Sequence, residues 1–310
     1  MTTTNNTAAT GERGKALAIL FIMPLFFSSN IIFGRAAVDE VEPFTLAFLR
    51  WGFTALLLAP FALPLLKGRS GHLRSITPTL LLMGFMGMWV CGALVYLALK
   101  YTTATNGTLI YTSSPVLIIL IEWLFKGRAI RWREGFGVTI AFLGIVAIVV
   151  RGSWDNLLAL QFNLGDLIFV GTALSWAIYS VGLKSNRLQS LGTLPLFMAI
   201  AASGALLLAP FAAAEIVYTR NFPTTGSAWF NITGIVFLAS LLAFSAFQYG
   251  VKVLGASLAG VFLYLLPVYG VGLAIVFLGE ELFAFHIWGI ALVLGGVILA
   301  TVPTGLLKKR

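Results

Sequence analysis

The chain has 310 residues, of which 59% are hydrophobic and only 10% are charged, and its mean hydropathy is +0.96. A water-soluble domain carries roughly 25% charged residues, so this composition excludes a soluble enzyme and indicates an integral membrane protein. The formal net charge of +9 does not predict nucleic-acid binding, because the basic residues stand in short groups between apolar runs instead of on one polar face.

Apolar runs long enough to cross a bilayer predict ten transmembrane helices. A helix needs about 20 apolar residues to span the hydrocarbon core. The predicted spans are residues 15–38, 43–66, 77–99, 103–125, 132–150, 165–184, 192–213, 228–250, 256–278 and 284–303. A polar tail, 1–14, precedes them and a basic tail, 304–310, follows them. The first run is too long for a secretory signal, so we expect it to be retained as a helix.

The distribution of Lys and Arg predicts that both termini are cytoplasmic. With the N-terminus inside, fifteen of the twenty basic residues fall in cytoplasmic segments, and Arg50 lies within the second span. The external segments then hold only Arg35, Lys100, Arg151 and Arg220. This asymmetry is what the positive-inside rule requires, and an even number of spans agrees with it.

An internal repeat divides the chain into two related halves. Residues 55–62 recur unchanged as residues 205–212, and at an offset of 152 Lys100 aligns with Lys252 and Pro115 with Pro267. We therefore predict two five-helix repeats, 15–150 and 165–303. Because five is odd, the second repeat enters the membrane from the opposite side. Inverted repeats are typical of alternating-access transporters, although some channels also contain them.

Several short stretches resemble the ten-helix EamA-type exporters of the drug/metabolite transporter superfamily. They are Phe27–Asn30, Leu49–Trp51, Ala98–Ala104, Pro115, Pro267, Leu278–Glu280 and Trp288–Gly289. The resemblance covers about residues 15–303 and is strongest to bacterial amino acid exporters of the aromatic type. It implies a basket of helices around a central cavity, with the fifth and tenth helices at the periphery, in the inner membrane. Phe27-Ser28 and Gly127-Arg128 depart from the family's Trp-Gly and Gly-Glu.

Two charged residues within predicted spans are candidates for a transport role, because charge inside a membrane is costly. Arg50 could attract a substrate carboxylate. Alternatively, it snorkels outward or pairs with the acidic residues at positions 39, 40 and 42. Glu122 could couple transport to protons or recognise a substrate ammonium, or it could form an i,i+4 pair with Lys126.

Aromatic and amide side chains near the helix centres could line a substrate path. Trp176 and Tyr179 share one helix face, and at an offset of 149 they correspond to Phe27 and Asn30, which would place four side chains around a two-fold axis. The full set is Asn30, Tyr96, Tyr101, Tyr111, Trp176, Tyr179, Gln248, Tyr249, Tyr264 and Tyr269. Stacking and hydrogen bonds from such a set suit a small-molecule cavity. Interface belts and simple packing are the alternatives.

Pro115 and Pro267 are repeat-related and predicted to lie in mid-helix, where proline removes a backbone hydrogen bond. They are candidate hinges or passive kinks. His72 and His286 have no neighbouring ligand set, so no metal site is predicted, and no glycine-rich nucleotide loop is present. We expect no cofactor and no catalytic residues.

The sequence thus predicts a secondary transporter that exports amino acids and similar metabolites through one central site. Its partners would be the substrate and membrane lipids, with anionic headgroups at the basic loops, and not nucleic acid. A drug or nucleotide-sugar carrier is the closest alternative. A channel and an intramembrane enzyme are further ones, the latter disfavoured because no acid/base pair, nucleophile or metal set converges by spacing. The oligomeric state stays open.

Overall fold

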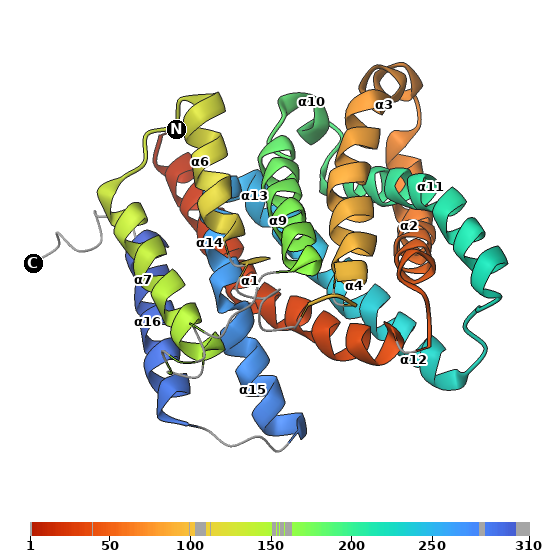
Figure 1. Cartoon of the computed structure of the whole chain (residues 1–310). Helices are drawn as coiled ribbons and strands as arrows, with labels where there is room; N and C mark the ends of the chain where they lie inside the picture. Colours follow the sequence, from red (N-terminus) through yellow and green to blue (C-terminus); the bar gives the residue numbers. More distant parts are fainter. Residues whose placement is uncertain are drawn as a thin grey trace, which may run out of the picture.

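The computed structural model is helical throughout the part of the chain that it describes (Figure 1). The described residues are 2–38, 40–98, 100–102, 110–111, 113–150, 163–278 and 283–301, together with residues 153, 155 and 158.

The helices follow one another with short connections. In the first half they are α1 (Thr2–Val38), α2 (Pro43–Leu66), α3 (Ser70–Gly84), η1 (Phe85–Leu94), α4 (Val95–Ala98), α6 (Ser114–Lys126) and α7 (Trp132–Val149). In the second half they are α9 (Leu164–Gly182), α10 (Asn186–Gln189), α11 (Thr193–Thr219), α12 (Gly226–Gly234), η2 (Ile235–Leu242), α13 (Ala243–Leu254), α14 (Ala256–Val261), η3 (Phe262–Leu265), α15 (Leu266–Leu278) and α16 (Ala284–Thr301).

Five of the described helical segments are long and apolar enough to cross a membrane. They are Pro43–Leu66, Ser70–Ala98, Leu164–Gly182, Thr193–Thr219 and Gly226–Leu254. Ala256–Gly270 and Ala284–Ala300 are apolar but shorter. The fourth predicted span, 103–125, lies partly outside the described residues, so the count of ten stays a prediction.

Two helices extend well past their predicted limits. Helix α1 begins at Thr2, although the apolar run starts only near residue 15, because no proline interrupts residues 2–14. Helix α11 continues beyond residue 213 and ends at Arg220, whose φ of 52° is left-handed. In both cases the apolar pattern predicts where a helix meets lipid, and the backbone continues into the polar zone.

Polar contacts between connections mark the two ends of the bundle. At one end, Arg69 donates to the Ser190 carbonyl and His72 contacts Ser190. This is the end predicted to be cytoplasmic, and we call it the basic end. At the opposite end, Lys100 pairs with Glu42 at 2.7 Å.

Large apolar side chains cover much of the outer surface of the bundle. Leu56, Phe61, Trp123, Phe125 and Phe136 are all exposed. Exposed apolar patches of this kind are unfavourable in water and mark contact with a membrane or a partner. Such a surface is what a helix bundle embedded in lipid presents.

The pairs α2 with α11 and α7 with α16 pack along each other, at opposite sides of the bundle (Figure 1). Glycines bring α7 and α16 close together. A Cβ added at Gly144 would lie 2.7 Å from the Gly289 carbonyl oxygen, and one added at Gly137 would lie 2.6 Å from that of Gly296. Small residues allow this approach in membrane bundles. The repeat offset of 152 exchanges the two contacts, which is the pattern of an antiparallel pair crossing at a local two-fold axis.

A π-helical segment interrupts the long helix of each half at the same place. Segment η1 begins at Phe85 and η2 at Ile235, an offset of 150 that equals the offset of the repeated octapeptide. π-Helix is rare and is found frequently at functional sites. Its presence at equivalent places in both halves directed attention to the side chains around it.

Candidate transport site

A buried arginine lies at the centre of a polar cluster formed by four helical segments. Arg50 of α2 is only 4% exposed. Its Nε donates to Ser240 Oγ at 2.8 Å, and its Nη1 donates to the hydroxyl of Tyr96 at 3.2 Å. The Tyr96 hydroxyl donates in turn to Asn30 Oδ1 at 3.0 Å, which also accepts from Arg50 Nη1 at 3.4 Å. These contacts join α1, α2, α4 and η2 around one guanidinium.

The guanidinium of Arg50 has no carboxylate partner among the described residues. The alternative that it pairs with nearby acids or snorkels outward is wrong for the residues described, since Glu42 binds Lys100 and Glu40 accepts from Thr225. Residue 39 lies outside the described residues. Arg50 is instead satisfied by neutral oxygens and by the Trp51 ring, whose centroid is 4.5 Å from Cζ. The cluster therefore carries an uncompensated positive charge.

The π-helical segment η2 supplies two of these oxygens. Arg50 Nη2 donates to the Ala239 carbonyl at 3.2 Å, and the Ser240 hydroxyl that accepts from Nε donates to the Ile235 carbonyl, five residues back. A wide helical turn leaves carbonyls turned away from the regular ladder. The sequence analysis did not identify Ser240, because a single serine in a long apolar run carries no signal of its own.

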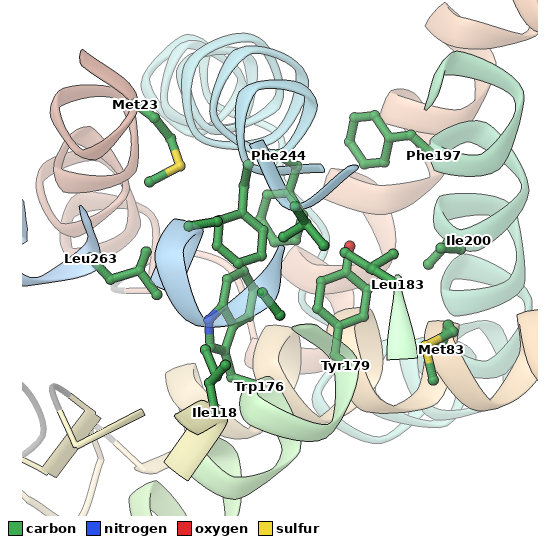
Figure 2. Packing of buried hydrophobic residues seen from close by; sticks show 14 of the residues in the cluster. Met23, Met83, Ile118, Trp176, Tyr179, Leu183, Phe197, Ile200, Phe244 and Leu263 are labelled. Carbon is green, nitrogen blue, oxygen red and sulfur yellow. The ribbon is translucent and has the colours of Figure 1, made fainter. Parts of the chain in front are cut away.

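Aromatic rings fill the space beside this cluster (Figure 2). Trp176 of α9 contacts Phe27 of α1 at a centroid distance of 5.9 Å, so the structure brings together two residues that the repeat predicts to be equivalent. Phe244, at the start of α13, lies 5.1 Å from Phe27 and 5.5 Å from Trp176. Phe244 also meets Trp51 at 4.8 Å. The sequence analysis missed Phe244, since one phenylalanine among twenty-five is unremarkable.

A second polar pair lies on the other side of these rings. Gln248 Nε2 donates to the hydroxyl of Tyr179 at 3.2 Å, and both side chains are buried. Within the described part of the chain, Gln248 Oε1 and Trp176 Nε1 have no hydrogen-bond partner. Buried polar atoms of this kind are uncommon in folded proteins and require a physical explanation.

The remaining tyrosines do not all join the centre. Tyr111 lies 6.4 Å from Trp176, and Tyr264 is fully buried with an unpartnered hydroxyl. Tyr269 donates to the Phe21 carbonyl at 2.8 Å on an exposed face, and Tyr101 is exposed. Tyr249 is half-buried. Tyr269 and Tyr101 therefore do not line the centre in this structure.

Glu122 is buried at the basic end, but its partner is not the predicted one. Lys126 donates to the Val181 carbonyl, while Glu122 Oε2 accepts from Ser257 Oγ at 2.5 Å. Arg128 approaches the same oxygen at 3.5 Å and binds Glu134 more closely, at 2.8 Å. The i,i+4 interpretation with Lys126 is thus wrong, because the tertiary contacts place a hydroxyl and a guanidinium nearer. Glu122 is the less compensated of two buried carboxylates that share one arginine.

The two repeat-related prolines begin helices instead of interrupting them. Pro115 is the second residue of α6, and Pro267 is the second residue of α15, directly after the 3₁₀ segment η3. The predicted mid-helix position is wrong for both. Proline is tolerated in the first helical turn, where its missing N–H has no intrahelical partner in any case. Both nevertheless mark places where one helical segment gives way to another, and their role as hinges stays a prediction.

Within the described ranges, no group of three His, Cys, Asp or Glu side chains is placed to hold a metal ion. Positions 279 and 280, part of the stretch that resembles exporters, lie outside those ranges.

Comparisons with known proteins place the chain among transporters. Residues 14–150 and 163–302 each match the EamA-like transporter family of the drug/metabolite transporter superfamily. The uncharacterized transporter YyaM of Bacillus subtilis is 26% identical over 91% of this chain and 93% of its own. A biotin transporter of Salmonella typhimurium is 26% identical over 79% of each chain.

A solved crystal structure shares the fold. It aligns with 96% of this chain and 99% of its own at a TM-score of 0.78 and 22% identity. An uncharacterized transporter of Archaeoglobus fulgidus is 28% identical over 93% of this chain. Since the family match covers well over half of the residues, the protein belongs to the EamA-like transporter family.

Proposed function

We propose that the protein is a secondary transporter of small organic carboxylates, with apolar and aromatic amino acids as the first candidates. It would export them across the bacterial inner membrane by alternating access between two inverted halves. The observation that carries this proposal is the buried guanidinium of Arg50, which has no carboxylate partner among the described residues and adjoins an aromatic cluster.

Arg50 supports a carboxylate substrate on electrostatic grounds. A charged side chain within a membrane is expensive to maintain and marks a substrate or ion pathway. Guanidinium is the group best shaped to bind carboxylates, because its planar N–H groups match the two oxygens. An anionic substrate would supply the counter-charge that the described protein residues do not.

The rings next to Arg50 support a substrate with an apolar body. Phe27, Trp51, Trp176 and Phe244 lie within 6 Å of one another in a connected series of edge contacts. Aromatic side chains bury a large apolar area and prefer such edge-to-face geometry with another ring. An aromatic or aliphatic side chain could therefore replace one protein ring by another of similar character.

Alternating access is supported by the two-fold relations in the bundle. The Phe27–Trp176 contact joins repeat-equivalent residues, and the offset of 152 exchanges the two glycine contacts between α7 and α16. In inverted-repeat transporters the substrate site lies near such an axis, between the two halves.

The site near Arg50 does not require a substrate amino group. No carboxylate among the described residues lies beside the guanidinium to bind an ammonium, and Glu122 is at the basic end, bound to Ser257. Carboxylates without an amino group are therefore a second candidate class. The similarity to a biotin transporter agrees with this class.

Counterflow in proteoliposomes tests the proposal. We expect labelled phenylalanine and its desamino analogue phenylpropionate to exchange, and phenethylamine, which lacks the carboxylate, to remain outside. Saturable exchange of labelled substrate would contradict a channel. Transport of cationic dyes or nucleotide sugars, with no carboxylate carried, would overturn the proposal in favour of a drug or nucleotide-sugar carrier.

A further inference from the structure

We propose that Tyr179 and Gln248 form a second substrate subsite, which binds a neutral hydrogen-bonding group at the end of the substrate away from the carboxylate. This inference rests on the proposed function and narrows its substrate class. It starts from the pair's place in the repeat.

The Tyr179–Gln248 pair is the repeat counterpart of the pair at Arg50. Asn30 corresponds to Tyr179 at an offset of 149, and Tyr96 corresponds to Gln248 at the offset of 152 that aligns Lys100 with Lys252. In each half the two residues hydrogen-bond to each other, at 3.0 Å for Tyr96–Asn30 and 3.2 Å for Gln248–Tyr179. Equivalent positions thus build a polar pair on each side of the central rings.

The two pairs differ in charge. At the repeat offset of 150, Arg50 corresponds to Ile200, which is fully buried. Within the described part of the chain, no charged side chain hydrogen-bonds to Tyr179 or Gln248. One pair is therefore suited to an anion, and the other only to an uncharged group. A substrate that contacts both would be polar at two ends but charged at one.

The neutral pair has free hydrogen-bonding capacity. Gln248 is 2% exposed, and its Oε1 has no partner among the described residues. The Tyr179 oxygen accepts from Gln248 Nε2, which leaves its own O–H free to donate. A buried unsatisfied acceptor is destabilising unless something binds it. A ligand group that both donates and accepts would satisfy Gln248 Oε1 and the Tyr179 hydroxyl together.

Phe244 lies between the two polar pairs and indicates the size of the ligand. Its ring centroid is 5.7 Å from Arg50 Cζ and 6.4 Å from the Tyr179 ring (Figure 2). A molecule that reaches both sites must take the place of this ring. The Phe244 side chain could turn away because the π-helical η2 ends only two residues earlier, at Leu242. The ligand thus needs a ring-sized apolar body between its polar ends.

These features define a substrate class: a carboxylate, an apolar body about the size of one ring, and a neutral tip that donates and accepts hydrogen bonds. Hydroxyaryl and cyclic amide or ureide groups have such tips. A bare hydrocarbon tip leaves Gln248 Oε1 unsatisfied. A charged tip is disfavoured because no described charge lies beside it to offset its desolvation.

A matched pair of substrates tests the subsite directly. We would measure kcat/KM for counterflow of para-hydroxyphenylpropionate and phenylpropionate, which differ only in the hydroxyl. The wild-type protein should prefer the hydroxylated compound by about 2- to 12-fold, the value of one neutral hydrogen bond. Gln248→Met and Tyr179→Phe should each bring this ratio close to one while phenylpropionate is still carried. Tyr96→Phe, at the equivalent position beside Arg50, should lower transport of both compounds and preserve the ratio.

The outcomes separate this inference from the proposed function. Transport of both compounds without preference in the wild type overturns the subsite and leaves carboxylate transport intact. A preference that survives in both Gln248→Met and Tyr179→Phe also overturns it. Loss of all transport in both variants assigns the pair a structural role and counts against recognition. If the wild type carries neither compound, the proposed function fails and this inference fails with it.

Discussion

Arg50→Gln is the change that most directly tests how the site recognises a substrate. The four hydrogen bonds of the Arg50 side chain occupy four of the five N–H groups that a guanidinium carries. One N–H on Nη2 therefore remains for a substrate carboxylate. Glutamine keeps hydrogen-bonding capacity beside Ser240 but removes both the charge and this donor.

The expected loss follows from that single bond. A hydrogen bond to a charged group contributes about 1.5–3 kcal/mol, which corresponds to a fall of about 10- to 150-fold in kcat/KM for phenylpropionate. The neutral carboxamide of the same molecule should change by less than about threefold, because it gains nothing from the charge. Arg50→Lys should fall between wild type and Arg50→Gln, since lysine keeps the charge but not the planar fork.

The assay is initial-rate counterflow in proteoliposomes, with monodispersity in detergent as the control for folding. The competing account is that Arg50 only joins α2 to η2 through Ser240 and the Ala239 carbonyl. In that case the carboxylate and the carboxamide would lose transport to the same extent in Arg50→Gln. An equal loss in a folded variant would refute the recognition argument.

Three further predictions concern coupling, packing and orientation. Glu122→Gln should keep counterflow within about twofold but abolish stimulation by a pH gradient, because an amide cannot take up the proton that its buried carboxylate could. Gly144→Ala should lower the free energy of unfolding by about 1–3 kcal/mol, since its Cβ would lie 2.7 Å from a backbone oxygen of α16, whereas Gly135→Ala on the same helix meets nothing within 4 Å; thermal unfolding in detergent compares the two. In a cysteine-free background, an impermeant maleimide added to intact cells should label Thr224→Cys and not Asn186→Cys, because basic connections remain cytoplasmic.

Each of these has a clear contrary result. An unchanged gradient response in Glu122→Gln removes this residue as a coupling site. Equal stability of the two alanine variants would show that α7 and α16 are not in close contact. Labelling of the Asn186→Cys variant alone would invert the topology, and labelling of both in intact cells would contradict the orientation of at least one connection.

Sequence patterns predicted the class of fold and the family, because both depend on local composition. The apolar run at 132–150 corresponds to α7, Trp132–Val149, within one residue at its end, since lipid contact sets both limits of that helix. The repeat in residues 55–62 and 205–212 likewise anticipated equivalent contacts, and the Phe27–Trp176 pair meets as expected. The predictions were wrong where a helix leaves the lipid zone, as in α1, and where proline begins a helix, as in Pro115.

By itself, the sequence determined that this chain is an apolar helical protein of a transporter family, with an arginine inside a predicted span. Only the tertiary structure decided what that arginine contacts. Ser240 and Phe244 are unexceptional in the sequence, yet the π-helical turn of η2 brings Ser240 to Arg50, and Phe244 follows it into the centre. Glu122 likewise contacts Ser257, which is 135 positions away in the chain, and not Lys126 on its own helix. Local spacing fixes which residues share a helix face, whereas the packing of one helix against another fixes which faces meet.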